Sequence, residues 1–192
     1  MTVKPLRSVY QVKILLMDSK PPVWRRLLIR SDIRLNVFHT AIQSSMGWED
    51  CHLHQFRKDG MVFGAEEDNE FKDDFVKNET QYKLSDLLKK EKESLHYEYD
   101  FGDSWMHKIT LEKILPFDSS TQLVQCIKGK RACPPEDCGG IWRYEFLLEA
   151  ISDPSHEEHE EMLSWLGGEF DPEYLDLNAI NHLLSESIQQ EK

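Results

Sequence analysis

Apolar and polar residues alternate along the first thirty positions, a pattern that predicts paired β-strands. Tyr10, Val12, Ile14 and Leu16 recur with a period of two. Residues 23–29 repeat the alternation after a break at two prolines. We therefore expect an antiparallel pair of strands with one buried face.

The period becomes helical over residues 35–46. Asn36 is the expected N-cap of this helix, and Gly47 is its expected C-terminal stop. His39 and Gln43 stand four positions apart, so they share a face of the predicted helix.

Two hairpins are predicted next. In the first, residues 51–56 place His52, His54 and Phe56 on one face, and a turn at 58–60 leads to a second strand at 61–63. In the second, strands at 95–101 and 105–111 meet at a turn that contains Gly102. Between the hairpins, residues 65–82 are acidic and predict a mobile surface loop, and a short helix at 83–90 is capped by Ser85.

The remainder of the chain is predominantly helical in pattern. A short strand at 123–127 precedes a connection rich in Gly, Pro and Cys at 129–140. Helices are expected around 144–151, at 155–166 with Trp165 inward, and after Asp171. We predict one α+β domain over residues 1–192, with a largely antiparallel sheet, helices packed on it, a strand-rich part at 8–128 and a helical part at 141–188.

Composition and charge narrow the possible functions. The 192 residues are 40% hydrophobic and 30% charged, which is typical of a globular chain, and the net charge is -12. Such an acidic surface repels phosphate backbones, so nucleic acid is a disfavoured partner and a protein partner is favoured. No apolar run of about 18 residues or signal-peptide core is present, so we expect a cytoplasmic protein without a membrane span, whose four cysteines stay reduced or bind metal.

The segment Y-E-Y-D-F-G-D-S-W-M-H, at 97–107, combines aromatic residues with polar groups of several kinds. Asp100, Asp103 and His107 could hold a metal or act as an acid/base set. Alternatively, the two aspartates cap N–H groups of a tight turn whose glycine supplies a positive φ. The D-F-G triplet does not indicate a kinase, because no H-R-D-x-x-x-x-N segment accompanies it.

Two further sets of residues are candidates for a metal site, with zinc as the possible cofactor. His52 and His54 could supply half of a tetrahedral site, or simply lie on an exposed sheet face. Cys126, Cys133 and Cys138, spaced C-x6-C-x4-C, could close around zinc with a fourth ligand from His or Asp, or be small buried hydrophobes.

Other residues are candidates for binding. Trp48 and Trp105 are expected as anchors in the core or at its rim. Arg25 and Arg26 lie on opposite faces of their strand, and with Lys128, Lys130 and Arg131 they are the basic clusters available to an anion. Glu136 and Asp137 either complete a metal site or favour the positive end of the following helix.

Several segments together resemble the plasmid pRiA4b open-reading-frame-3-like family. They are P-P-V-W-R-R, G-W-E-D-C-H-L-H-Q-F, Y-E-Y-D-F-G-D-S-W-M-H, R-A-C-P-P-E-D-C-G-G and W-L-G-G-E-F-D-P, in that order, within residues 10–184. The resemblance implies a stand-alone α+β domain without an established activity, and some members are labelled transposon passenger or resolvase-like proteins. Arg143 departs from the family pattern, in which Gly commonly follows the tryptophan, and this affects the local turn.

Three functions remain open on the sequence alone. The first is a non-catalytic interaction or accessory module, favoured because no P-loop, G-x-S-x-G or dinucleotide motif is present. Its binding surfaces would be the helical third and the acidic loop. The second is a metal-dependent hydrolase or nuclease-like enzyme built on His52, His54, Asp100, Asp103 and His107. The third, a DNA-associated mobile-element protein, rests on the family label and is opposed by the charge.

Overall fold

The computed structural model describes residues 7–65, 76–118 and 122–189, and it shows an α+β fold. Eight strands form one sheet in the order β5-β4-β3-β6-β7-β1-β2-β8, and each neighbouring pair is antiparallel except β4 and β5. The strands are β1 Ser8–Leu16, β2 Trp24–Arg30, β3 His54–Lys58, β4 Met61–Gly64, β5 Val76–Asn78, β6 Ser94–Tyr99, β7 Trp105–Pro116 and β8 Val124–Lys130. The predicted fold class and both predicted hairpins are confirmed.

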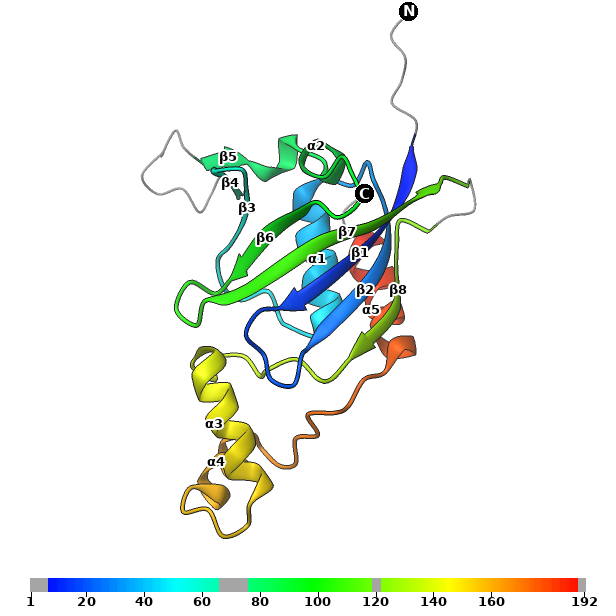
Figure 1. Cartoon of the computed structure of the whole chain (residues 1–192). Coiled ribbons are helices and arrows are strands. Elements are labelled where there is room, and N and C mark those ends of the chain that lie inside the picture. The colour runs from blue at the N-terminus through cyan, green and yellow to red at the C-terminus, as the bar shows by residue number, and fades with distance from the viewer. Residues whose placement is uncertain (1–6, 66–75, 119–121, 190–192) are drawn as a thin grey trace, which may run out of the picture.

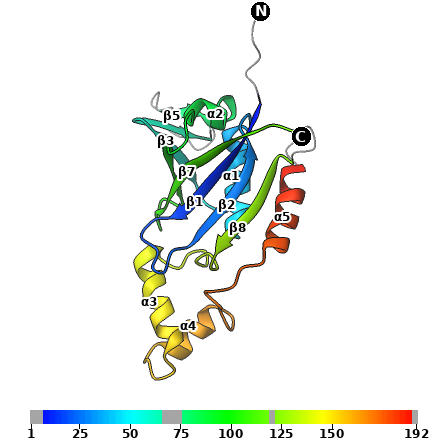
Figure 2. The ribbon, with the colours of Figure 1, turned by 45° about the vertical axis from the view of Figure 1, so that its right-hand side comes forward.

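Helices cover one face of the sheet and extend beyond its end. They are α1 Leu35–Met46, α2 Leu84–Leu87, α3 Gly140–Ser152, α4 His159–Trp165 and α5 Leu177–Gln189, with a 3-10 turn η1 at Glu79–Gln81. Helices α1 and α5 lie side by side against the sheet, whereas α3 and α4 lie past the end of the strands near the β1–β2 turn (Figures 1 and 2). The other face of the central strands is not covered by a helix among the described residues.

The core lies between α1 and the sheet. Val12, Ile14 and Phe38 are fully buried there, and each contributes about 1.5–3 kcal/mol of apolar transfer free energy. The buried face of α1 also carries His39 and Gln43, as their four-residue spacing predicted. Because buried polar groups need hydrogen-bond partners, these two side chains indicate where the core becomes a polar site.

Several predicted helix ends were wrong. Helix α1 is preceded by Arg34 rather than capped by Asn36, and Gly47 ends it in the left-handed conformation as expected. Helix α2 has only four residues and follows Lys83, whose backbone N–H donates to Asp86.

The helical third also differs in detail from the prediction. Trp165 is 49% exposed rather than turned inward, because α4 packs against α3 past the end of the sheet in the described part of the chain. The last helix begins at Leu177, and residues 166–176 before it are irregular.

The region between the two hairpins corrects two further predictions. Strand β3 begins at His54, so His52 lies before the strand and does not share its face. Residues 76–81 form β5 and η1 rather than a loop, while residues 66–75 of the predicted loop lie outside the described part. No helix in the described ranges is long and apolar enough to cross a membrane.

The β6–β7 turn is fastened to the loop before α3. The Gly139 N–H donates to Asp103 Oδ2 at 2.9 Å. Gly140 has a φ of +77°, and a Cβ placed on it would lie 2.6 Å from the backbone oxygen of Asp103. Glycine is therefore required here both for its backbone conformation and for the close approach of the turn.

We expect Gly140→Ala to destabilise the protein by about 2–3 kcal/mol, through left-handed strain and a clash with a backbone atom that has little room to yield. Gly167→Ala is the matched control, since Gly167 has a φ of +73° but a Cβ added to it would meet no atom within 4 Å. Its expected cost is about 1 kcal/mol. Urea unfolding of both variants measures the difference, and equal costs would contradict the close packing of the turn.

Candidate functional site

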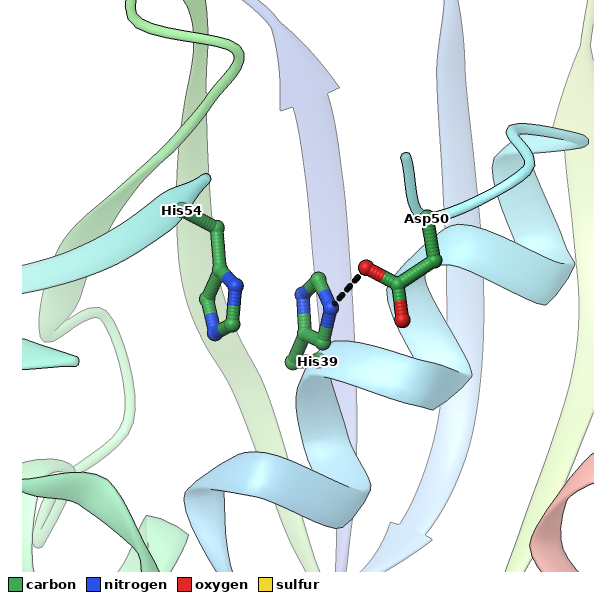
Figure 3. A group of neighbouring side chains, drawn as sticks. All are labelled: His39, Asp50 and His54. Carbon is green, nitrogen blue, oxygen red and sulfur yellow. Dashed lines mark hydrogen bonds and ion pairs between the residues drawn. The ribbon is translucent and has the colours of Figure 1, made fainter. Parts of the chain in front are cut away.

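Two imidazoles and a carboxylate from three segments converge at the end of the core. His39 comes from α1, Asp50 from the loop after α1, and His54 from β3 (Figure 3). His39 Nε2 lies 2.7 Å from Asp50 Oδ1, and the two imidazole rings stack with centroids 3.4 Å apart and planes 4° apart. One ligand atom from each residue lies within 4.8 Å of the other two, so the three form a possible metal site.

The end of α1 holds Asp50 in place. The Gly47 N–H donates to the Gln43 carbonyl, which turns the chain back towards the helix. The Gln43 side chain then accepts from the Asp50 N–H at 3.2 Å. Asp50 itself has a φ of 56°, an uncommon conformation for a residue with a side chain. The loop is therefore fixed by hydrogen bonds in a conformation that directs the carboxylate at His39.

Each imidazole also has one nitrogen that is hydrogen-bonded to a residue outside the group. His39 Nδ1 is hydrogen-bonded to the Tyr97 hydroxyl at 2.8 Å, and Gln43 Nε2 donates to the same hydroxyl at 2.9 Å. His54 Nε2 lies 2.9 Å from Glu79 Oε2, and Glu79 is only 3% exposed. A carboxylate accepts a hydrogen bond, so the proton of a neutral His54 is on Nε2 and the lone pair is on Nδ1. Outer partners of this kind orient the histidine ligands of metal sites.

The charges suit a cation. Burial lowers the pKa of His39, although the hydrogen bond to Asp50 opposes the shift. Burial raises the pKa of Asp50, but the hydrogen bond to His39 together with the charges of His39 and His54 outweighs it, and the net pKa is lowered. Near neutral pH the pair is therefore a neutral imidazole and a carboxylate, which are the forms that bind metal.

The group is open to solvent on one side. The Asp50 side chain is 50% exposed, while that of His39 is only 7% exposed. A pocket of about 480 Å³ opens there, lined by residues 39, 50, 51, 52, 53 and 54. An ion bound by three protein ligands at such a position keeps coordination sites for water or a substrate.

A second group of polar residues adjoins this pocket. The structure brings three candidates predicted from sequence to His52. Asp100 and Asp137 join it in one possible metal group, and Glu136 joins it, with Cys51, in another. Asp103 is not part of this group, because its carboxylate accepts from the Gly139 N–H.

Three other candidates, His107, Trp105 and Trp48, lie in the core. His107 is fully buried, and its Nδ1 lies 2.9 Å from the Trp105 carbonyl oxygen. Trp105 is 1% exposed, and Trp48 packs against it with ring centroids 6.0 Å apart. The Trp48 indole N–H donates to the Pro134 carbonyl. The structure thus gives these three residues packing contacts and does not place His107 in any of the possible metal groups of the described chain.

The buried position of His107 predicts an acid-sensitive fold. Burial lowers its pKa from 6.5 to about 4, so between these values the unfolded chain takes up a proton that the folded chain does not. Stability is complete above pH 6.5 and falls as the pH drops towards 4, by about 2 kcal/mol from this residue at pH 5. We expect His107→Phe to reduce the difference in unfolding free energy between pH 7.5 and pH 5 by that amount. An unchanged difference would contradict the assignment.

The two arginines differ in environment. Arg25 is 2% exposed, and its guanidinium donates to the carbonyls of Ser45, Trp24 and Lys130 at 2.7–3.2 Å. Arg26 faces the opposite side and donates two hydrogen bonds to Glu112. Their side chains therefore do not form one anion-binding surface.

The cysteines do not assemble as ligands. Cys126 and Cys138 are buried, Cys133 is partly buried, and burial raises the pKa of all three thiols. Within the described chain, no group of ligand atoms within 4.8 Å of one another includes any of the three. A raised pKa disfavours the thiolate form that binds zinc.

Sequence reasoning missed two of the three residues of the first group, His39 and Asp50, and it also missed Glu79, the hydrogen-bond partner of His54. The helix face that His39 shares with Gln43 is predicted from their spacing, and this shared face was the available signal. Asp50 precedes His54 by four residues in a loop, so no period relates them. Glu79 belongs to a segment whose composition predicts a mobile loop.

Comparisons with known proteins agree with this fold. Residues 8–179 match the family model described as plasmid pRiA4b ORF-3-like protein. The uncharacterized protein y4hQ of Sinorhizobium fredii is 38% identical over 160 residues, covering 83% of this chain and 81% of that protein. A crystal structure of a protein of unknown function from Methanosarcina mazei superposes with a TM-score of 0.80 at 40% identity, covering 91% of this chain and 98% of the other.

Proposed function

The chain belongs to the plasmid pRiA4b ORF-3-like family, and for this member we propose a metal-dependent hydrolytic function centred on His39, Asp50 and His54. The metal is a divalent transition ion, and zinc suits the donor set of two imidazoles and one carboxylate. The absence of a recognised catalytic motif favoured a non-catalytic module on sequence grounds. The convergence of these three residues changes that preference.

The proposal rests on one observation: three possible ligand atoms lie close together, and both imidazoles have outer hydrogen-bond partners. Three ligand atoms lie within 4.8 Å of one another, and each imidazole has its other nitrogen hydrogen-bonded to a buried residue, Tyr97 or Glu79. The partners of the two rings come from three separate segments, with Asp50 and Tyr97 beside His39 and Glu79 beside His54. In this arrangement, the outer residues hold one nitrogen of each ring and leave the other, His39 Nε2 or His54 Nδ1, for an ion.

Binding an ion changes the group in two defined ways. An ion bound at His39 Nε2 would take the place of the proton that lies between this nitrogen and Asp50, and the neutral ring would then carry its proton on Nδ1, where it can donate to the Tyr97 hydroxyl. Because the lone pair of an imidazole nitrogen lies in the ring plane, the rings of His39 and His54 also turn out of their parallel stack to share one ion. The side open to the pocket then holds water, whose pKa a bound zinc lowers to about 7.

Cobalt substitution tests the hydrolytic proposal without a known substrate. The protein used is the Asp137→Asn variant, so that the neighbouring group around His52 loses one of its carboxylates. This variant is freed of metal and loaded with Co²⁺, and its visible spectrum is recorded from pH 6 to pH 9. We expect a spectral change that follows one proton with a midpoint near pH 7–8, as metal-bound water ionises. A bound cobalt spectrum that does not change with pH would indicate a closed site and would contradict a hydrolytic role.

A second candidate function is a protein-interaction module, and exposed aromatic residues favour it. Trp142 is 79% exposed, Tyr174 60% and Trp165 49%, and all lie in the helical third. Large exposed aromatic residues are frequent anchors in protein interfaces. This candidate predicts a partner that the wild type binds and the Trp142→Ala variant does not, with the unfolding free energy unchanged.

A further inference from the structure

Beside the first group, which is His39, Asp50 and His54, two segments distant in sequence bring carboxylates to His52. His52 lies in the loop before β3, Asp100 at the β6–β7 turn, and Asp137 in the loop before α3. His52 Nε2 is 3.0 Å from Asp137 Oδ1 and 3.7 Å from Asp100 Oδ2. One ligand atom from each of these three residues lies within 4.8 Å of the other two.

Turn chemistry accounts for only part of Asp100. Its Oδ1 accepts from the Gly102 N–H at 2.8 Å and from the Asp103 N–H at 3.3 Å. This is the capping role expected of an aspartate in a tight turn. Its Oδ2 instead faces His52, and the side chain is 10% exposed. The residue thus caps the turn with one oxygen and offers the other to a ligand.

Two buried polar atoms at this place lack a hydrogen-bond partner in the described part of the chain. They are His52 Nε2, whose contact with Asp137 is close but poorly aligned for a hydrogen bond, and Glu136 Oε2. The other oxygen of Glu136 accepts from the Glu49 N–H and the Tyr99 hydroxyl. A buried polar group without a partner costs about 1–3 kcal/mol, and a cation coordinated beside His52 would satisfy its Nε2 and offset the charge of the neighbouring Glu136.

The local charge points to a cation. Asp100 and Asp137 have their ion pairs with His52 alone, and Glu136 has none, among the described residues. No lysine or arginine of the described chain forms an ion pair with these carboxylates. One imidazole cannot neutralise three carboxylates, whereas a divalent ion compensates most of their charge.

We infer that His52, Asp100 and Asp137 bind a second divalent cation next to the first group. The mixed nitrogen and oxygen donors suit zinc or manganese. The Asp103–Gly139 hydrogen bond and the close packing of Gly140 connect the turn that carries Asp100 to the loop that carries Asp137. They would thereby keep the two carboxylates close enough to bind one ion. The inference stands on its own residues and does not require the hydrolytic function proposed above.

Counting bound zinc tests the inference. Metal-free protein is dialysed against excess Zn²⁺ in a buffer that does not chelate it, and zinc and protein are measured by mass spectrometry and absorbance. We expect two ions per wild-type chain, one in His52→Gln or Asp137→Asn, and one in Asp50→Asn. Asp59→Asn is the matched control, because Asp59 is an exposed aspartate outside both groups, and it should retain two.

The results separate the two sites. One ion in the wild type, lost in Asp50→Asn and kept in Asp137→Asn, overturns the second site and leaves the first. One ion lost in Asp137→Asn and kept in Asp50→Asn overturns the first site and supports the second. Two ions that remain in both His52→Gln and Asp137→Asn also overturn the inference. Circular dichroism confirms that each variant is folded.

Discussion

Replacing His54 by glutamine lowers the affinity of the first group for zinc at least about 100-fold, equivalent to about 2.7 kcal/mol of binding free energy. In the proposed site His54 is one of three protein ligands among the described residues, so its loss should exceed the roughly 10–100-fold effect that is usual for an outer partner. Asp137→Asn serves as the background, so that only the first group binds. Competition with a chromophoric chelator measures the zinc dissociation constant.

Two further variants show whether this effect is specific. Glu79→Gln keeps the shape of the side chain but removes the charge that orients His54, and we expect it to weaken zinc binding about 10–100-fold. His96→Gln is the control, since His96 is on β6 but belongs to no possible metal group of the described chain. Equal dissociation constants for His54→Gln and His96→Gln would remove His54 from the site.

Replacing Arg25 by methionine destabilises the fold by about 3 kcal/mol. Methionine retains much of the apolar stem, but the three carbonyls that Arg25 satisfies lose a charged donor in a buried environment. One of them, Ser45, is in the last turn of α1, where carbonyls lack helical partners and a cation is favourable. For a chain of this size we expect the melting temperature to fall by roughly 10 °C.

The adjacent arginine is a natural comparison. Arg26→Met breaks an ion pair with Glu112 whose two side chains are 24% and 22% exposed, and ion pairs that solvent reaches contribute about 1 kcal/mol or less. Thermal unfolding of both variants under one condition tests the contrast. A loss in Arg26→Met as large as in Arg25→Met would contradict the structural role assigned to Arg25.

Periodicity predicted the fold well because it records which face of an element is buried. The alternation in residues 10–16 and 23–29 identified β1 and β2, and the helical spacing after residue 35 identified α1. Helix ends were predicted less well, since they depend on tertiary contacts. Helix α2 is limited to four residues within a segment whose leucines suggested eight.

The site could be predicted only in part, for a physical reason. The polar residues of the Y-E-Y-D-F-G-D-S-W-M-H segment were predicted to act together. In the structure, however, the strand places His107 in the core, while the turn places Asp100 beside His52. The first group forms because α1 packs on the sheet. This packing brings His39 into contact with His54, which lies fifteen positions later in the sequence. Neither spacing nor composition encodes that contact, and Glu79 approaches only because β5 adds to the edge of the sheet.

Anomalous X-ray diffraction at the zinc edge, from crystals grown with Zn²⁺, tests the central claim most directly. We predict a peak about 2.0–2.2 Å from His39 Nε2, His54 Nδ1 and an Asp50 oxygen, with the two imidazoles turned out of their parallel stack. Zinc bound instead at the cysteines, or His39 and His54 still stacked with no peak beside them, would contradict it.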